Sequence, residues 1–143
     1  MLSLSRTFGL LGMLAAVTVL AGCSSPAPVP VSSGTGKTIA VSGQPSSAAE
    51  QALFTGTAVW GDGGCMYAEA DDGATFLIVF PYGTTLDEGD TVRLPDGYVI
   101  AAGHEIKLGG GFHAGSADDE DLAKVPAACI TEEVFWASGE TAE

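Results

Sequence analysis

The stretch CMYAEADDGATFLIVF, residues 65–80, decides the fold. Two runs of strand-forming residues, 65–70 and 75–80, lie on either side of the turn Asp71-Asp72-Gly73. Gly73 supplies the positive φ that a tight hairpin turn requires. The second run, TFLIVF, is apolar at every position after its first, which is typical of a strand covered on both faces. This stretch therefore predicts a β-hairpin with a central second strand.

Short runs of the same kind lie on both sides of this hairpin. Residues 53–60 (LFTGTAVW) precede it and end at the chain breaker Gly61-Asp62-Gly63-Gly64. In Pro95-Asp96-Gly97, the proline presets φ and the glycine takes the left-handed position, so this tripeptide predicts a turn. The remaining strands are expected at residues 91–94, 98–101, 104–108 and 130–137.

Six or seven short strands separated by turns predict a mainly β domain. We expect a small closed or nearly closed β-barrel, with a β-sandwich as the alternative. The segment Leu86-x-x-Gly89-Asp90-x-Val92 resembles the strand entry of OB-like and SH3-like barrels. An OB-like barrel usually has a helix between its third and fourth strands, whereas the late helix expected in this chain precedes the last strand.

That late helix is expected within residues 116–124. Ser116 and Asp119 have the spacing of a capping box, and the acidic residues that follow favour the N-terminal end of a helix. Pro126 ends the segment, so the helix has one or two turns at most. The preceding residues 109–115 (GGGFHAG) are expected to form a mobile loop.

The N-terminal end of the chain has the pattern of an export signal. Arg6 precedes the uncharged run 8–20 (FGLLGMLAAVTVL), which is shorter than the about 20 residues that span a membrane. The next residues complete Leu20-Ala21-Gly22-Cys23, which resembles the lipobox of bacterial lipoproteins. An ordinary signal peptide is the alternative. The resemblance implies that residues 1–22 are a lipoprotein signal peptide, and that Cys23 carries diacylglycerol and a further acyl chain such as palmitate.

Composition divides the remaining chain into three parts. Residues 23–52 are rich in Ser, Pro and Gly, with scattered apolar residues, so we expect a flexible tether. Residues 53–138 are the predicted small β domain, and residues 139–143 are a flexible tail. The lipid would hold this domain on the extracytoplasmic side of the cell membrane or the outer membrane.

The charge of the chain limits its partners. Without residues 1–22 the protein has four basic and 18 acidic side chains, which is a net charge of −14. Nucleic acid is excluded because its binding needs a basic patch that neutralises phosphates. We expect contact with the membrane through the lipid, a cationic ligand or an envelope protein as partner, and a monomer. Solubility alone is the alternative explanation of the acidic surface.

Two cysteines remain once Cys23 carries lipid. In an exported protein an even pair is interpreted as a disulfide, so Cys65 and Cys129 are expected to be joined. Closing a loop of this length stabilises a fold by about 4 kcal/mol. Two free thiols that bind a metal are the alternative, although the sequence has no Cys-x-x-Cys spacing.

The residues with functional chemistry are few. No Gly-x-Ser-x-Gly motif is present, and the sequence singles out no catalytic set, so we expect a non-enzymatic binding or interaction module without a cofactor. A small metal-dependent or hydrolytic envelope enzyme is the alternative. Two histidines and three aspartates could bind a divalent metal or a cationic partner, or could merely be structural. These candidate residues are His104, His113, Asp118, Asp119 and Asp121.

Overall fold

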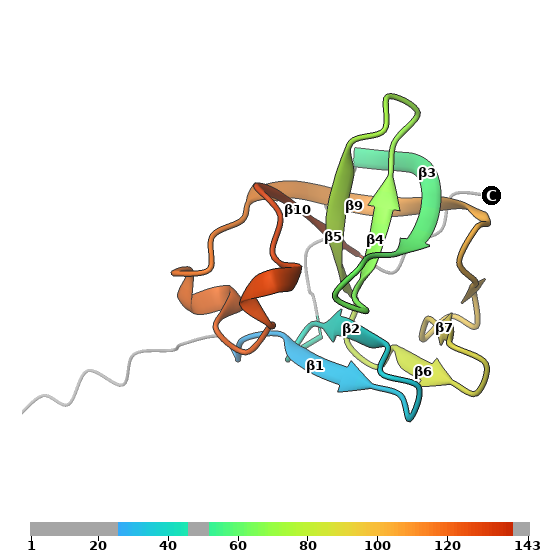
Figure 1. Ribbon diagram of the computed structural model, residues 1–143, viewed down its shortest axis with the longest axis horizontal. Coiled ribbons are helices and arrows are strands. Elements are labelled where there is room, and N and C mark those ends of the chain that lie inside the picture. The colour runs from blue at the N-terminus through green and yellow to red at the C-terminus, as the bar shows by residue number, and fades with distance from the viewer. Residues whose placement is uncertain (1–25, 46–51, 139–143) are drawn as a thin grey trace, which may run out of the picture.

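The computed structural model describes residues 26–45 and 52–138, which form ten β-strands and two single-turn 3-10 helices (Figure 1). The expected fold class is confirmed, since this part of the chain is mainly β, contains no α-helix and forms a closed five-stranded barrel. The predicted signal peptide, Cys23 and the predicted tail lie outside the described residues.

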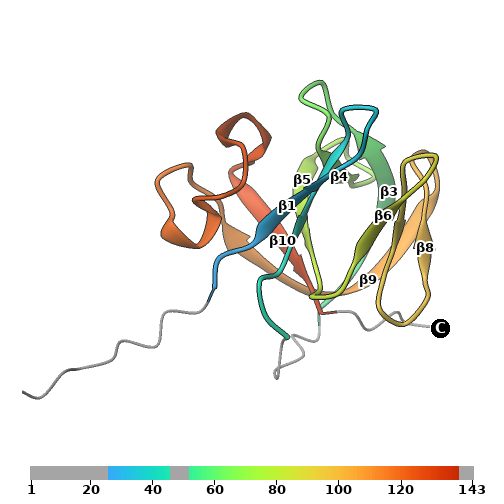
Figure 2. The same ribbon diagram turned by 90° about the horizontal axis from the view of Figure 1, so that it is seen from below.

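The barrel closes because β5 pairs with a strand on each edge. Around the barrel the order is β3-β4-β5-β10-β9 and back to β3, and only the β5–β10 pair is parallel. In this connectivity the third and fifth barrel strands are parallel neighbours, as in an OB-like barrel (Figure 2). The barrel strands are β3 (Ala52–Trp60), β4 (Met66–Glu69), β5 (Thr75–Phe80), β9 (Glu105–Ala114) and β10 (Glu133–Ala137).

Side chains that alternate in direction along the barrel strands form two separate hydrophobic cores. Because successive side chains of a strand point to opposite faces, Ile78 and Phe80 of β5 join the core inside the barrel. Their neighbours Leu77 and Val79 belong to an outer core on the other face of β5 and β10. The TFLIVF run is therefore buried on both faces, as its sequence predicted.

A three-stranded antiparallel sheet lies between the third and fourth barrel strands, where an OB-like barrel usually has its helix. It consists of β6 (Thr85–Asp87), β7 (Thr91–Arg93) and β8 (Val99–Ile100). Buried side chains of this part of the chain, among them Val92 and Ile100, join the core inside the barrel. The sheet thus covers the end of the barrel at which β5 ends and β9 begins.

The prediction that residues 23–52 form a flexible tether is wrong for the described part of that range. Strands β1 (Val29–Ser32) and β2 (Thr38–Val41) form a hairpin, and β2 pairs in parallel with the end of β5. Ile39 and Val41 are buried in the core inside the barrel. The apolar segment TIAV folds here because it pairs with the edge of β5, although the surrounding composition is typical of a linker.

Strands β2 and β4 share one edge of β5. The pairing of β4 covers the first half of β5, from Thr75 to Leu77, and β2 pairs with the end of β5 at Val79 and Phe80. The N–H of Thr38 donates to the carbonyl oxygen of Gly64 at 2.9 Å. The N-terminal hairpin therefore continues the barrel wall beyond β4.

The prediction of a mobile loop at residues 109–115 is also wrong, because β9 continues through the glycines to Ala114. A Cβ at Gly110 would collide with the carbonyl oxygen of Trp136 and lie 2.8 Å from Cζ of Phe135. Because Gly110 has no side chain, β10 can approach β9 closely at this position. The glycine run is thus a packing requirement of the sheet.

Residues 115–132, which we call the lobe, connect β9 to β10 and project on the side of the barrel away from the β6–β8 sheet (Figures 1 and 2). The lobe contains η1 (Glu120–Leu122) and η2 (Ala127–Cys129). The predicted helix within residues 116–124 is therefore reduced to one 3-10 turn. Its cap is Asp119, and the chain turns after Leu122 so that Leu122 and Val125 both reach the outer core.

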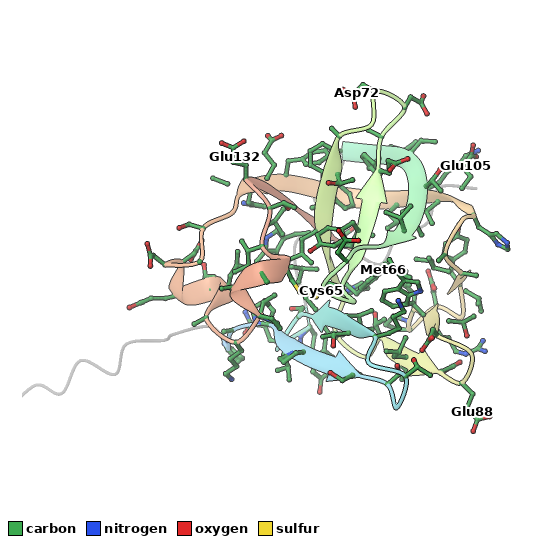
Figure 3. The ribbon with its side chains drawn as sticks, in the orientation of Figure 1. Cys65, Met66, Asp72, Glu88, Glu105 and Glu132 are labelled. Carbon is green, nitrogen blue, oxygen red and sulfur yellow. A yellow bond between two sulfur atoms is a disulfide. The ribbon has the colours of Figure 1, made fainter. Side chains whose placement is uncertain are left out.

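The predicted disulfide between Cys65 and Cys129 is confirmed. It joins the residue before β4 to the last residue of η2, with 5.9 Å between the Cα atoms (Figure 3). Both cysteines are buried in the outer core. The bond attaches the lobe to the barrel wall, and it indicates an oxidising, extracytoplasmic environment.

Candidate functional site

The structure brings three of the five candidate ligand residues to one pocket. His113 lies near the end of β9, and Asp119 and Asp121 lie at the start of η1. Asp118 is exposed in the same lobe but does not line the pocket. His104 lies in the turn before β9, where its side chain is exposed and its carbonyl oxygen accepts the N–H of Ala58 at 3.0 Å. The five residues are therefore not one set.

The pocket lies between the lobe and the outer face of the barrel. Its volume is about 540 Å³, and its walls come from the segments after β2 and β5, from η1, and from the ends of β9 and β10. This volume is within the range of about 300–1,000 Å³ that is usual for small-molecule sites. The rings and carboxylates that line it are Tyr82, His113, Trp136, Asp119 and Asp121.

One wall of the pocket is aromatic. His113 and Trp136 belong to adjacent antiparallel strands, and their rings meet edge to face with 6.0 Å between centroids. Both side chains are on the outer face, because the alternating partners Phe112 and Phe135 contact each other on the inner face. Tyr82, from the turn after β5, adds a third ring and is 53% exposed.

A second wall, at the start of η1, is acidic. The carboxylate of Asp119 accepts the backbone N–H of Asp121 at 2.9 Å, which fixes the start of η1. The next residue, Leu122, is only 1% exposed and anchors this turn in the outer core. No described residue lining the pocket is a lysine or arginine, and neither carboxylate forms an ion pair with one in the described ranges. The carboxylates are thus held on a packed support and present negative charge to the pocket.

Ser138 also lines the pocket and has an unusual hydroxyl group. Its Oγ atom is buried and has no hydrogen-bond partner among the described residues. A buried polar atom without a partner typically costs about 1–3 kcal/mol of stability. Such an atom requires an explanation, and a ligand that donates a hydrogen bond is one.

A second polar cluster, which the sequence did not reveal, connects two hairpin turns. Asp90, in the turn between β6 and β7, accepts hydrogen bonds from the hydroxyls of Ser33 and Thr35 in the turn between β1 and β2. The hydrogen bond from Thr35 is the main cause that lowers the pKa of Asp90, with smaller contributions from Ser33 and the charge of Lys37. Because these acceptor contacts are made within the protein, we interpret the cluster as a structural link.

In the part of the chain that the structure describes, no group of three or more His, Cys, Asp or Glu side chains is arranged to hold a metal ion. No helix within those residues is long and apolar enough to cross a bilayer. The chain matches no protein-family model, no curated protein and no solved structure. The function therefore has to be inferred from the chemistry of the pocket.

Proposed function

We propose that this protein is a lipid-anchored extracytoplasmic binding module whose ligand site is the pocket between the lobe and the barrel. The pocket is the observation that carries the proposal. Binding sites usually combine apolar and aromatic surface with a few placed polar groups, and this pocket has that composition. The segment Leu20-Ala21-Gly22-Cys23 supports the lipid anchor, since it has the residues of a lipobox.

Binding is favoured over catalysis by what the pocket contains. An enzyme of the hydrolytic type needs a nucleophile, a general base and an orienting group within reach of one another. The sequence has no motif that supplies such a set. Of the two serine hydroxyls that line the pocket, that of Ser42 donates to the carbonyl oxygen of Gln44, and that of Ser138 has no partner among the described residues, so neither is paired with a base there. The other side chains of the lining are mainly rings, two carboxylates and apolar groups. Such groups recognise a ligand by its shape and charge, as a binding module does.

The test uses Trp136 as a reporter, because the chain has two tryptophans and only Trp136 lines the pocket. In the variant Trp60→Phe, we expect fluorescence of the oxidised mature chain to change when fragments from a mixed library of cationic, neutral and anionic compounds bind. The added variant Ser42→Phe should abolish those changes, because Ser42 lines the pocket and follows Ala40 on the outer face, so that the ring fills the pocket. Ala117→Phe, in the same lobe but outside the pocket, is the control. Fragment binding that is indifferent to Ser42→Phe would overturn the proposal, and so would a library without binders.

A further inference from the structure

We infer that the pocket binds an organic cation, in which an ammonium or guanidinium group is attached to a hydrocarbon portion. This inference rests on the function proposed above, because it names the ligand class of the same site. Three independent features of the pocket support it: its charge, its rings and its apolar surface.

The charge of the pocket favours a cation. Asp119 and Asp121 are on one wall, and no lysine or arginine among the described residues lines the pocket to neutralise them. Charges at a partly desolvated site interact more strongly than they do in bulk water. The protein outside residues 1–22 is also strongly acidic, so its overall field attracts cations and repels anions.

The rings favour an organic cation over a metal ion. A cation within about 6 Å of a ring centroid is attracted by the π face, most strongly by tryptophan. Trp136 and Tyr82 line the same pocket as the two carboxylates. The same protein already uses this interaction elsewhere, since the ammonium of Lys37 lies 5.3 Å from the ring centroid of Trp60. A divalent ion such as Ca²⁺ prefers six or more oxygen ligands, which two carboxylates do not supply.

The apolar surface indicates that the cation has a hydrocarbon portion. Pro81 and Leu122 also line the pocket, and the volume of about 540 Å³ is far larger than an isolated ammonium ion needs. The hydroxyl of Ser138, which lacks a partner in the described structure, can accept a hydrogen bond from an N–H of the ligand. The size of the pocket and the hydroxyl of Ser138 thus favour the same ligand class as the charge of the pocket.

The experiment compares matched probes by isothermal titration calorimetry on the oxidised mature chain. The probes are agmatine and spermidine as cations, 1,5-pentanediol as a neutral compound, glutarate as an anion, and CaCl₂. We expect only the two amines to bind. The double variant Asp119→Asn/Asp121→Asn should weaken their binding by roughly tenfold or more, because it removes both charges but keeps the size of the side chains. Asp118→Asn is the matched control and should change the affinity less than twofold.

The outcomes separate this inference from the proposed function. Pentanediol that binds as well as agmatine, with no effect of the double variant, would show a real pocket without selectivity for cations. Calcium binding that outcompetes agmatine would replace the organic cation with a metal ion. If no probe binds and Ser42→Phe also leaves every fragment response unchanged, the proposed function fails together with the inference.

A last arm distinguishes a dissolved amine from the ammonium head group of a lipid. Vesicles of phosphatidylethanolamine and phosphatidylcholine carry ammonium groups, whereas phosphatidylglycerol vesicles do not. Head-group binding predicts competition between the first two vesicles and agmatine, which the double variant at Asp119 and Asp121 reduces. A dissolved amine as ligand predicts agmatine binding that vesicles do not affect. Both results support an organic cation, and competition by phosphatidylglycerol alone would contradict it.

Discussion

Cys65 and Cys129 are joined by a disulfide that attaches the lobe to the barrel wall. The bond lies in the outer core, and the same core contains Leu122, the residue next to Asp121. The acidic wall of the pocket is therefore held by a covalent bond near the end of the lobe and by the hydrophobic packing of Leu122 beside Asp121. The shape of the pocket therefore depends on the disulfide between these two cysteines.

Removal of the disulfide should destabilise the protein strongly. The cysteines are separated by 64 positions, and loop closure of this length contributes about 4 kcal/mol in the chain-entropy description. We expect the double variant Cys65→Ala/Cys129→Ala to lose about that much free energy of unfolding, measured by urea denaturation. Mass spectrometry without reductant should find one linked peptide pair in the native protein. Alkylation of both cysteines in that protein would contradict the expectation.

Substitution of Gly110 should weaken the contact between β9 and β10. A methyl group there would meet the carbonyl oxygen of Trp136, and overpacking of this kind typically costs about 1–3 kcal/mol. We expect Gly110→Ala to lower the free energy of unfolding by at least that amount. Gly34→Ala is the control, because a Cβ at Gly34 meets no atom within 4 Å. Equal stability of the two variants would show that the strands separate without cost.

Acid should weaken the link between the two hairpin turns. The pKa of Asp90 lies below its ordinary 3.8, first because of the hydrogen bond from Thr35. A carboxyl whose pKa is lower in the folded state stabilises the fold above its unfolded pKa, and this contribution disappears as the pH falls through the folded pKa. Asp90→Asn should therefore destabilise at neutral pH, and the difference from the parent should shrink below about pH 4.

The substitution itself introduces little strain at that position. Asp90 has a φ of 57°, and asparagine tolerates this left-handed conformation well. The variant Thr35→Ala removes the main hydrogen-bond donor and should give a similar pH profile in the same denaturation series. A difference between parent and Asp90→Asn that stays constant from pH 7 to pH 2 would be inconsistent with this assignment.

Lipid attachment is predicted to depend on Cys23. The variant Cys23→Ser should accumulate as a precursor without lipid, because the thiol is the expected site of diacylglyceryl transfer. Incorporation of radiolabelled palmitate in growing cells measures this directly. The variant Cys65→Ala/Cys129→Ala, which keeps Cys23, should still be labelled. Label that remains on Cys23→Ser would mean that the anchor lies elsewhere or is absent.

The central hairpin was predictable because its signals are local. The turn at Asp71-Asp72-Gly73 forms as expected, with Gly73 at a φ of 84° and the N–H of Ala74 donating to the carboxylate of Asp72. The strands on both sides differ from the predicted ranges by two residues at most. Turn residues and unbroken apolar runs determine such a unit without help from distant parts of the chain.

The two incorrect predictions have a common physical cause, since both depended on average composition. Ile39 and Val41 lie in a Ser/Pro/Gly-rich range whose composition predicts a linker. They form a strand only because the edge of β5 is available to β2. The glycine run has few local preferences, and its extended form is imposed by Trp136 on the neighbouring strand. Contacts between residues far apart in sequence decided both segments.

The sequence predicted only some of the residues of the candidate site. His113, Asp119 and Asp121 are candidates because of their chemistry, but nothing in the sequence marks the rings of Trp136 and Tyr82 as parts of a site. Alternation in the last strand was the available signal, because burial of Phe135 on one face directs Trp136 to the other. Which outward ring lines a pocket depends on the position of the lobe, and the sequence does not specify that position.

The early start of β1 would keep the protein close to the bilayer if Cys23 carries the proposed lipid. Val29 is only a few residues after Cys23, so a lipid on Cys23 would hold the start of β1 within about 20 Å of the membrane even with that linker fully extended. A Cβ at Gly43 would lie 2.6 Å from the carbonyl oxygen of Ala27, and the neighbours of Gly43 line the pocket. The pocket would then sample the thin aqueous layer beside the head groups, where its ligand has to be found.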